Sequence, residues 1–240
     1  LAIRLLTPLL GAGLWQRFMT GELGFVEDTT AAFCVPAAVL GILAYRRRRR
    51  LPRGVGTAML LFALCCIFFA GEEVSWGQHY AGYRTPGVVA GMNSQDQFNL
   101  HNTYSRYGGN LLNNVPRQAL NAGMVFIVIW PIVLTVLQRR ADRDRTAARL
   151  VAAVADRRRW WYWLLPTWRL IPVALMAVLL RLPTKMDNLL PAVWHEPHSY
   201  PHMALMERAG EFKEYCFALA LLLWATSVYR KLPRRRDASV

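Results

Sequence analysis

The chain has 240 residues, of which 54% are hydrophobic and only 18% are charged, and its mean hydropathy is +0.18. This composition is too apolar for an ordinary soluble domain of this length, and it excludes a disordered or collagen-like chain. The 29 Lys and Arg residues outnumber the 15 Asp and Glu residues, so the formal net charge is +14. We therefore expect an all-α polytopic membrane protein, with a single integral membrane domain over residues 1–240.

A helix needs roughly 20 predominantly apolar residues to cross the hydrocarbon core of a bilayer. Six stretches approach this length, and in chain order they cover residues 1–15, 29–45, 54–71, 121–138, 162–182 and 212–229. Pro36 and Pro131 lie inside two of them, where we expect kinks. The sequence therefore predicts a bundle of about six membrane-spanning helices.

Basic residues are concentrated between particular apolar stretches, at residues 46–53, 139–159 and 230–236. Segments rich in Lys and Arg remain in the cytoplasm, so with six spans both termini lie there. This topology places 21 of the 29 basic residues on the inner side and 11 of the 15 acidic residues on the outer side. We expect a bacterial inner-membrane protein whose arginine runs attract anionic lipids, with no nucleic-acid partner, because no stacking aromatic residues are interleaved with these runs.

The most unusual segment follows the third apolar stretch, which ends directly in Glu72 and Glu73. Carboxylates at the edge of a bilayer are costly unless they reach water, pair with a cation or bind a metal. One interpretation is that both simply reach water. The polar and aromatic residues that follow favour a functional role, so we take Glu72 and Glu73 as candidate catalytic residues. An outer-face polar pocket would then face the periplasm.

Residues 93–102 form a second polar segment, rich in amides and containing His101. It reads either as a polar loop with capping side chains or as a loop that folds back over Glu72 and Glu73, with its amides supplying hydrogen bonds. In the second interpretation His101 is a third candidate catalytic residue. The candidate substrate-binding residues are Ser75, Trp76, Gln78, Asn99 and Asn102.

Three glutamates, Glu207, Glu211 and Glu214, lie on one stripe of a helix at the start of the last apolar stretch. Their mutual repulsion requires a cation, which is either a neighbouring basic residue or a divalent metal shared with the carboxylates after the third stretch. The candidate metal ligands are Glu207, Glu211 and His79. A Ser75–His79 nucleophile pair is disfavoured, because the Gly-x-Ser-x-Gly turn is missing.

The segment Gly71–Gln78, followed by Asn99-Leu100-His101-Asn102, resembles a signature of uncharacterised bacterial multi-pass membrane proteins. That signature reads Gly-Glu-Glu-Ile/Val-Ser-Trp-Gly-Gln and then Asn-Leu-His-Asn, with an acidic Glu-Asp-Gly…Glu element before an early helix. Here the early element, at residues 22–27, lacks its Asp, and His79 stands where the group has Arg. The resemblance implies a shared fold and a shared outer-face site, but no particular reaction.

Two functions are consistent with these features. The first is a hydrolase or transferase acting on a lipid or lipid-linked substrate, in which a carboxylate serves as general base or a divalent metal activates water. The second is a non-catalytic accessory subunit or binding module of a membrane complex, in which the polar cluster locks helices together or binds a partner. The expected partners are membrane lipids and other membrane protein subunits.

Overall fold

The computed structural model describes residues 25–93, 97–100, 103–104, 109–180 and 209–232, without the side chains of residues 25–26, 109–110, 112–113 and 209–211. These residues form helices and connecting turns, and apart from an isolated bridge between Asn93 and Thr103 they contain no β-structure. The all-α prediction is therefore confirmed for this part of the chain. Its longer helices are α2 (Phe25–Arg46), α3 (Val55–Glu73), α6 (Gly109–Arg140), α7 (Arg145–Ala155), α9 (Ile171–Leu179) and α13 (Ala209–Lys231).

Four segments are long and apolar enough to cross a membrane: Glu27–Arg46, Val55–Glu73, Asn114–Arg140 and Trp160–Leu179. They match the predicted spans near 29–45, 54–71, 121–138 and 162–182. The predicted span near 212–229 is helical as part of α13, but it is not among these four. The predicted span near 1–15 lies outside the described residues, so the total of six stays a prediction.

The fourth of these segments is broken rather than continuous. It consists of α8 (Trp160–Leu164), the 3₁₀ turn η4 (Trp168–Leu170) and α9. Leu165 is extended, with ψ of 137°, because Pro166 follows it and disfavours the helical conformation in the preceding residue. By contrast, α2 and α6 continue through Pro36 and Pro131.

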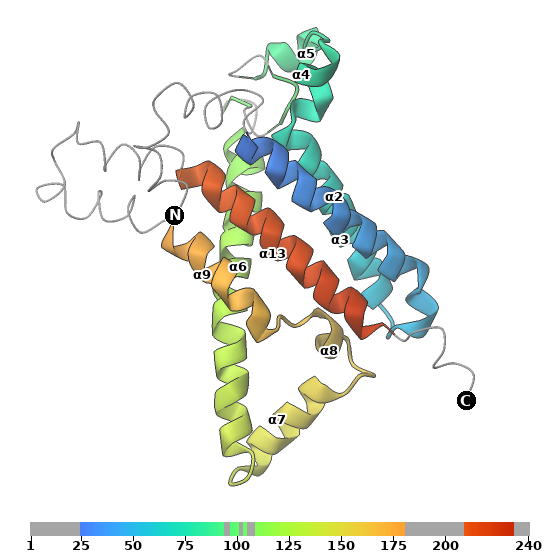
Figure 1. Ribbon diagram of the computed structural model, residues 1–240, viewed down its shortest axis with the longest axis vertical. Coiled ribbons are helices and arrows are strands. Elements are labelled where there is room, and N and C mark those ends of the chain that lie inside the picture. The colour runs from blue at the N-terminus through green and yellow to red at the C-terminus, as the bar shows by residue number, and fades with distance from the viewer. Residues whose placement is uncertain (1–24, 94–96, 101–102, 105–108, 181–208, 233–240) are drawn as a thin grey trace, which may run out of the picture.

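The helices α2, α3 and α13 pack side by side, and α13 lies between α2 and α9, which in turn packs on α6 (Figure 1). The core shared by α2, α3 and α13 consists of small side chains: Ala31, Cys34, Ala37, Ala38, Ala63, Cys66, Ala70, Ala218 and Ala225. A Cβ atom on Gly41 would lie 2.8 Å from the carbonyl oxygen of Met59. Small residues thus allow α2 and α3 to approach closely, as in many membrane helix pairs.

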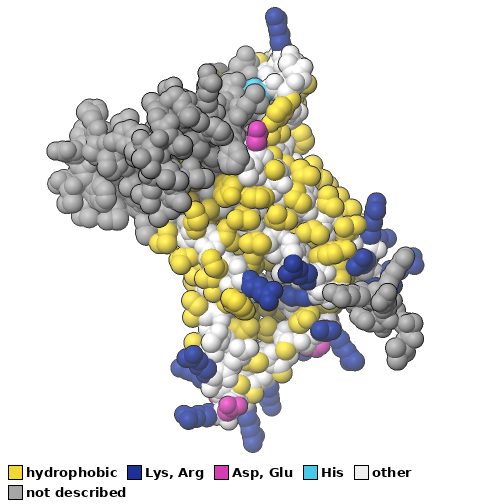
Figure 2. All heavy atoms as spheres, in the orientation of Figure 1, with side chains coloured by type: hydrophobic (Ala, Val, Ile, Leu, Met, Phe, Trp, Pro, Cys, Tyr) yellow, Lys and Arg dark blue, Asp and Glu magenta, His cyan; other side chains and the backbone are white. Residues whose placement is uncertain are grey.

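The long helices alternate in direction, so the chain's acidic and basic segments collect at opposite ends of the bundle (Figure 1). We call the end that carries the start of α2, the end of α3 and residues 74–93, 97–100 and 103–104 the acidic end. The opposite end carries η1 (Arg48–Arg50), α7 and the last turn of α13, and we call it the basic end. Figure 2 shows a broad hydrophobic surface, with most of the visible Lys and Arg side chains on its lower half. This polarity matches the predicted separation of charge.

The helix α6 is the most exposed of the candidate spans. Only 11% of its apolar window is buried, against 39% for α2 and for α3. Its exposed apolar side chains include Val125, Phe126, Ile129, Ile132, Val133 and Val136. An apolar surface of this extent is stable in contact with lipid or with another protein, but not in water.

Candidate functional site

The acidic end is built on a sharp turn at the end of α3. The helix ends at Glu73, and Ser75, Trp76 and Gly77 follow with φ of 46°, 52° and 83° in the 3₁₀ turn η2 (Ser75–Gly77). Glycine adopts this left-handed region readily, whereas Ser and Trp do so at a cost in free energy. Ser75 and Trp76 are therefore held in this conformation by their contacts with the rest of the structure.

The Glu72 carboxylate is the centre of those contacts, and this residue is only 4% exposed. Its Oε1 atom accepts a hydrogen bond from Trp76 Nε1 at 2.8 Å. Its Oε2 atom accepts one from the backbone N–H of Leu100 at 2.6 Å. Hydrogen bonds to a charged acceptor are the stronger ones, so Glu72 ties the end of α3 to a loop 28 residues further along the chain.

The packing of the Trp76 indole accounts for the glycine at position 71, which precedes Glu72 and Glu73. Its ring packs edge-on against Phe68, with 6.0 Å between ring centroids. A Cβ atom on Gly71 would lie 2.8 Å from three atoms of the same indole. Glycine at position 71 is therefore required for Trp76 to reach the Glu72 carboxylate.

Further hydrogen bonds join the turn to Phe98 and Asn99. Asn99 Nδ2 donates to Ser75 Oγ at 3.3 Å, and Asn93 Nδ2 donates to the Asn99 carbonyl at 2.7 Å. Gln78 Oε1 accepts from the backbone N–H of Phe98 at 2.6 Å. We define Glu72, Ser75, Trp76, Gln78, Asn93, Asn99 and Leu100 as the Glu72 network. Of the two interpretations of this segment, these contacts agree with the one in which it folds back, since Leu100 reaches Glu72 and Asn99 reaches Ser75.

The other predicted site residues lie at several places in the structure. Glu73 is half-buried and lies close enough to Cys34 of α2 to interact electrostatically with its thiol. His79 is half-buried in α4 (Gln78–Ala81). Glu211 lies at the start of α13, but its side chain is not described. The remaining candidates, His101, Asn102 and Glu207, lie outside the described residues.

A metal site is not visible in the part of the chain that the structure describes. There, no group of three or more His, Cys, Asp and Glu side chains is arranged to hold a metal ion. Two of the three candidate metal ligands, Glu207 and Glu211, have side chains outside that description. The metal site predicted from Glu207, Glu211 and His79 therefore stays a prediction.

The structure adds residues that the sequence patterns did not single out. The Tyr80 hydroxyl donates to Asp28 Oδ1, and this hydrogen bond, helped by burial and by the charges of Asp28 and Glu27, raises the pKa of Tyr80 to about 12. Tyr83 donates to the carbonyl oxygen of Trp76 at 3.1 Å. Tyr80 and Asp28 are 52 residues apart, so no local sequence pattern could have paired them.

Two more ionic features lie where α13 begins. Arg117 of α6 and Glu214 of α13 form an ion pair at 3.7 Å. Lys213 is only 6% exposed, and its ammonium group lies 5.6 Å from the centroid of the Phe217 ring. The repulsion expected along the glutamate stripe is thus offset at Glu214 by an arginine from another helix.

We compared the chain with protein-family models, with curated proteins and with solved structures, and none of them matches it. The resemblance carried by residues 71–78 and 99–102 therefore stays a prediction.

The chemistry available to the Glu72 network follows from its own contacts. Both carboxylate oxygens of Glu72 and the side chains of Ser75, Gln78 and Asn99 are engaged in holding the loop against the end of α3.

Proposed function

We propose that this protein is a non-catalytic binding module of a membrane complex, with its binding surface at the acidic end. The Glu72 network supports this proposal, because Ser75, Trp76, Gln78 and Asn99, which were expected to touch a substrate, are hydrogen-bonded within the network. A network of this kind favours one arrangement of the residues that it joins, from Glu72 to Leu100. A surface that already favours one arrangement loses little conformational entropy when a partner binds.

The observation that carries the proposal is a set of exposed apolar side chains beyond the end of the α3 span. Trp76, Tyr80, Val88, Leu100 and Tyr104 are 42%, 60%, 78%, 43% and 43% exposed. They belong to segments that the candidate membrane spans do not include. Exposed apolar groups rich in Trp and Tyr are typical of protein interaction sites.

The cellular setting is part of the proposal. We place the protein in a bacterial inner membrane with six spans and with both termini in the cytoplasm. The acidic end then faces the periplasm, where a partner subunit binds. The four apolar segments and the collection of arginine at the opposite end support this orientation.

The proposal is tested by photo-crosslinking in intact cells. A benzoylphenylalanine residue is placed at Val88, in α5 (Gly87–Ala90) of the acidic end, or at Leu150 in α7, a 49% exposed control at the basic end. We expect a defined protein adduct from position 88 and not from position 150. Glu72→Gln should abolish the adduct, whereas Asp142→Asn, which removes an exposed carboxylate at the basic end, should leave it unchanged.

Migration of the purified protein on native gels supplies a second readout. The binding module should run as part of a larger assembly, and Glu72→Gln should release it as a smaller species. Crosslinked adducts of equal strength from positions 88 and 150 would contradict the proposal. It would also be contradicted if Glu72→Gln disrupted the acidic end and the adduct from position 88 still formed.

One observation favours a second function, hydrolysis or group transfer on a lipid or lipid-linked substrate. Ser75 and Trp76 retain a strained left-handed backbone, and strain of this kind is concentrated at functional sites. In this case Glu72 or Glu73 would be the general base, or a divalent metal would be held by carboxylates and histidines from Glu73, His79, His101, Glu207 and Glu211.

Metal analysis of the purified protein distinguishes this second function. A divalent metal that is present in the wild type and lost in Glu73→Gln, with unchanged thermal stability, would favour the enzyme. A metal-free wild-type protein that still forms the position-88 adduct would favour the binding module.

A further inference from the structure

The basic end contains an open surface cavity of about 330 Å³, lined by Pro52, Arg53, Arg158, Arg159, Trp160 and Trp161. It joins two segments that are a hundred residues apart in the sequence, the turn before α3 and the loop before α8. Neither the Glu72 network nor the proposed function uses it. Its lining residues include three arginines and two tryptophans.

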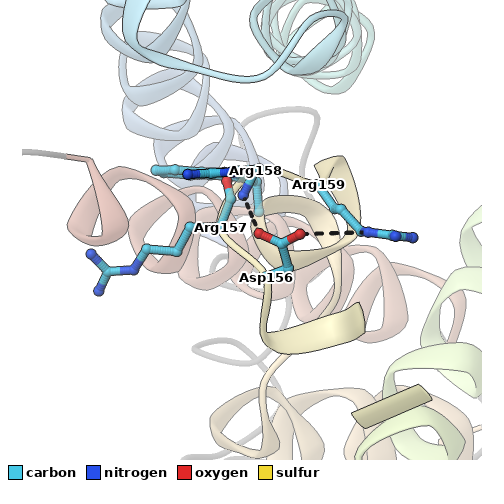
Figure 3. Close-up of polar contacts among 5 residues, drawn as sticks. Asp156, Arg157, Arg158 and Arg159 are labelled. Atoms are coloured by element: carbon cyan, nitrogen blue, oxygen red, sulfur yellow. Dashed lines mark hydrogen bonds and ion pairs between the residues drawn. The ribbon is translucent and has the colours of Figure 1, made fainter. Parts of the chain in front are cut away.

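The loop before α8 is held in place by its own hydrogen bonds (Figure 3). Asp156 Oδ1 accepts from the backbone N–H of Arg158 at 2.9 Å, and Asp156 Oδ2 lies 3.6 Å from Arg159 Nε. The Arg157 carbonyl accepts from Trp163 Nε1 at 2.9 Å, and Trp163 is only 4% exposed. The loop backbone is therefore fixed by one carboxylate and one buried indole.

Helix α8 is fixed in turn by the last part of α13. Lys231 Nζ donates to the carbonyl of Tyr162 at 2.7 Å, and Trp224 Nε1 donates to the carbonyl of Leu164 at 2.9 Å. Burial lowers the pKa of Lys231. These contacts set the position of the loop relative to the rest of the bundle, so the cavity has a defined wall on this side.

The charge in the cavity is not balanced. Asp156 offsets one of the three arginines, and among the described residues no carboxylate forms an ion pair with Arg53 or Arg158. Arg157 lies on the same loop, and its guanidinium is 5.6 Å from the centroid of the Tyr162 ring. The excess positive charge predicts an anionic ligand, and planar guanidinium groups match the geometry of phosphate oxygens.

The position of the cavity along the bundle identifies the source of that anion. The candidate spans begin at Val55 and at Trp160, directly beside the residues that line the cavity. The cavity therefore lies at the level where the hydrocarbon layer would end. Trp160 is 47% exposed, and its ring centroid lies 4.1 Å from that of Trp161. Exposed Trp at this depth is typical of contact with lipid headgroups.

We propose that this cavity binds the headgroup phosphate of an anionic phospholipid, with Arg53, Arg158 and Arg159 as the phosphate-binding residues. The indoles of Trp160 and Trp161 lie beside the glycerol backbone and the first carbons of the acyl chains. Basic pockets between the cytoplasmic ends of membrane helices bind anionic lipids in this way. The inference concerns the end of the bundle opposite the proposed binding module and does not depend on it.

The test compares two charge-matched double variants of the full chain. Arg53→Gln with Arg158→Gln removes two cavity arginines, and Arg145→Gln with Arg149→Gln removes two exposed arginines of α7 at the same end. Each purified protein is placed in mixed micelles of phosphatidylcholine and phosphatidylglycerol, and bound lipid is counted by native mass spectrometry. Thermal unfolding in phosphatidylcholine alone verifies that both variants fold.

We expect the wild type and the α7 variant to retain phosphatidylglycerol in preference to phosphatidylcholine. The cavity variant should bind it roughly tenfold more weakly. Equal losses in the two variants would mean that the whole basic face attracts anions without a specific site, which would overturn the proposal. A second arm adds inorganic phosphate without lipid: if phosphate alone stabilises the wild type as well as phosphatidylglycerol does, the ligand is a soluble anion and the lipid assignment is wrong.

Discussion

At the scale of single residues, the segment Gly71–Gln78 is explained by one buried carboxylate and its contacts. Glu72 needs donors, Trp76 supplies one of them, and Gly71 leaves room for the Trp76 ring. Gly77 has φ of 83°, which disfavours any residue with a side chain. The catalytic role of Glu72 stays a prediction, and its described contacts join the end of α3 to the loop that contains Leu100.

We expect Gly71→Ala to destabilise the protein by about 1–3 kcal/mol, because the new methyl group would overlap the Trp76 ring and displace it from Glu72. The free energy of unfolding in detergent measures this change. Gly123→Ala is the matched control, since it also lies within a helix and its Cβ would meet no atom within 4 Å. Equal stability of the two variants would show that the ring does not need this space.

A second prediction concerns the pH dependence that Tyr80 creates. Its pKa is raised from 10.0 to about 12, so the folded state holds the Tyr80 proton more tightly than the unfolded state does. The resulting stabilisation is fully present below pH 10 and is lost as the pH rises through about 12.

This prediction is measured by ultraviolet titration of tyrosinate in the wild type and in Tyr80→Phe. The difference between the two curves should show one tyrosine that ionises near pH 12. In Asp28→Asn, which removes the charged acceptor, its midpoint should fall toward the ordinary value. A late-titrating tyrosine that persists unchanged in Tyr80→Phe would contradict the assignment.

At the scale of helices, small side chains determine how closely α2, α3 and α13 pack. Ala63 is fully buried between them, and Gly41 faces the Met59 carbonyl. The helix α13 carries Lys213 and Glu214 in its early turns, which a helix surrounded by lipid on all sides would tolerate poorly. Its position between α2 and α9 gives these groups neighbours in the protein, such as Arg117 beside Glu214.

We expect Ala63→Leu to destabilise the bundle by about 1–3 kcal/mol, since the larger side chain would force α2 and α3 apart. Ala119→Leu, at an exposed position of α6, should have little effect, because the added methyl groups would face the surroundings rather than another helix. Thermal unfolding of both variants in the same detergent makes the comparison. A larger loss at position 119 than at position 63 would contradict this account of the packing.

At the scale of the whole molecule, the two ends differ in chemistry, and each carries its own candidate site. The acidic end has a hydrogen-bonded turn and loop with exposed aromatic residues, and the basic end has an open, arginine-lined cavity. This polarity predicts a fixed orientation in the membrane, because Lys and Arg near the ends of spans resist translocation.

We expect a single cysteine at Arg84 to react with a membrane-impermeant maleimide in intact cells, and one at Arg149 to react only after the cells are lysed. Both positions are exposed, the first at the acidic end and the second in α7. The native residues Cys34, Cys65, Cys66 and Cys216 are first replaced by Ala. Labelling of position 149 in intact cells would reverse the proposed orientation.

The sequence by itself determined the helical class, the four confirmed apolar segments and the separation of charge, because these depend on composition along the chain. One of its two interpretations of residues 93–102 was that this segment folds back over Glu72 and Glu73, with its amides supplying hydrogen bonds. Only the tertiary structure decided which groups meet: Leu100 with Glu72, Tyr80 with Asp28, and Arg53 with Arg158 around one cavity. Such pairings depend on how helices distant in the sequence pack, and that is set by the shapes of small residues such as Gly41 and Ala63, which carry no chemical signature of their own.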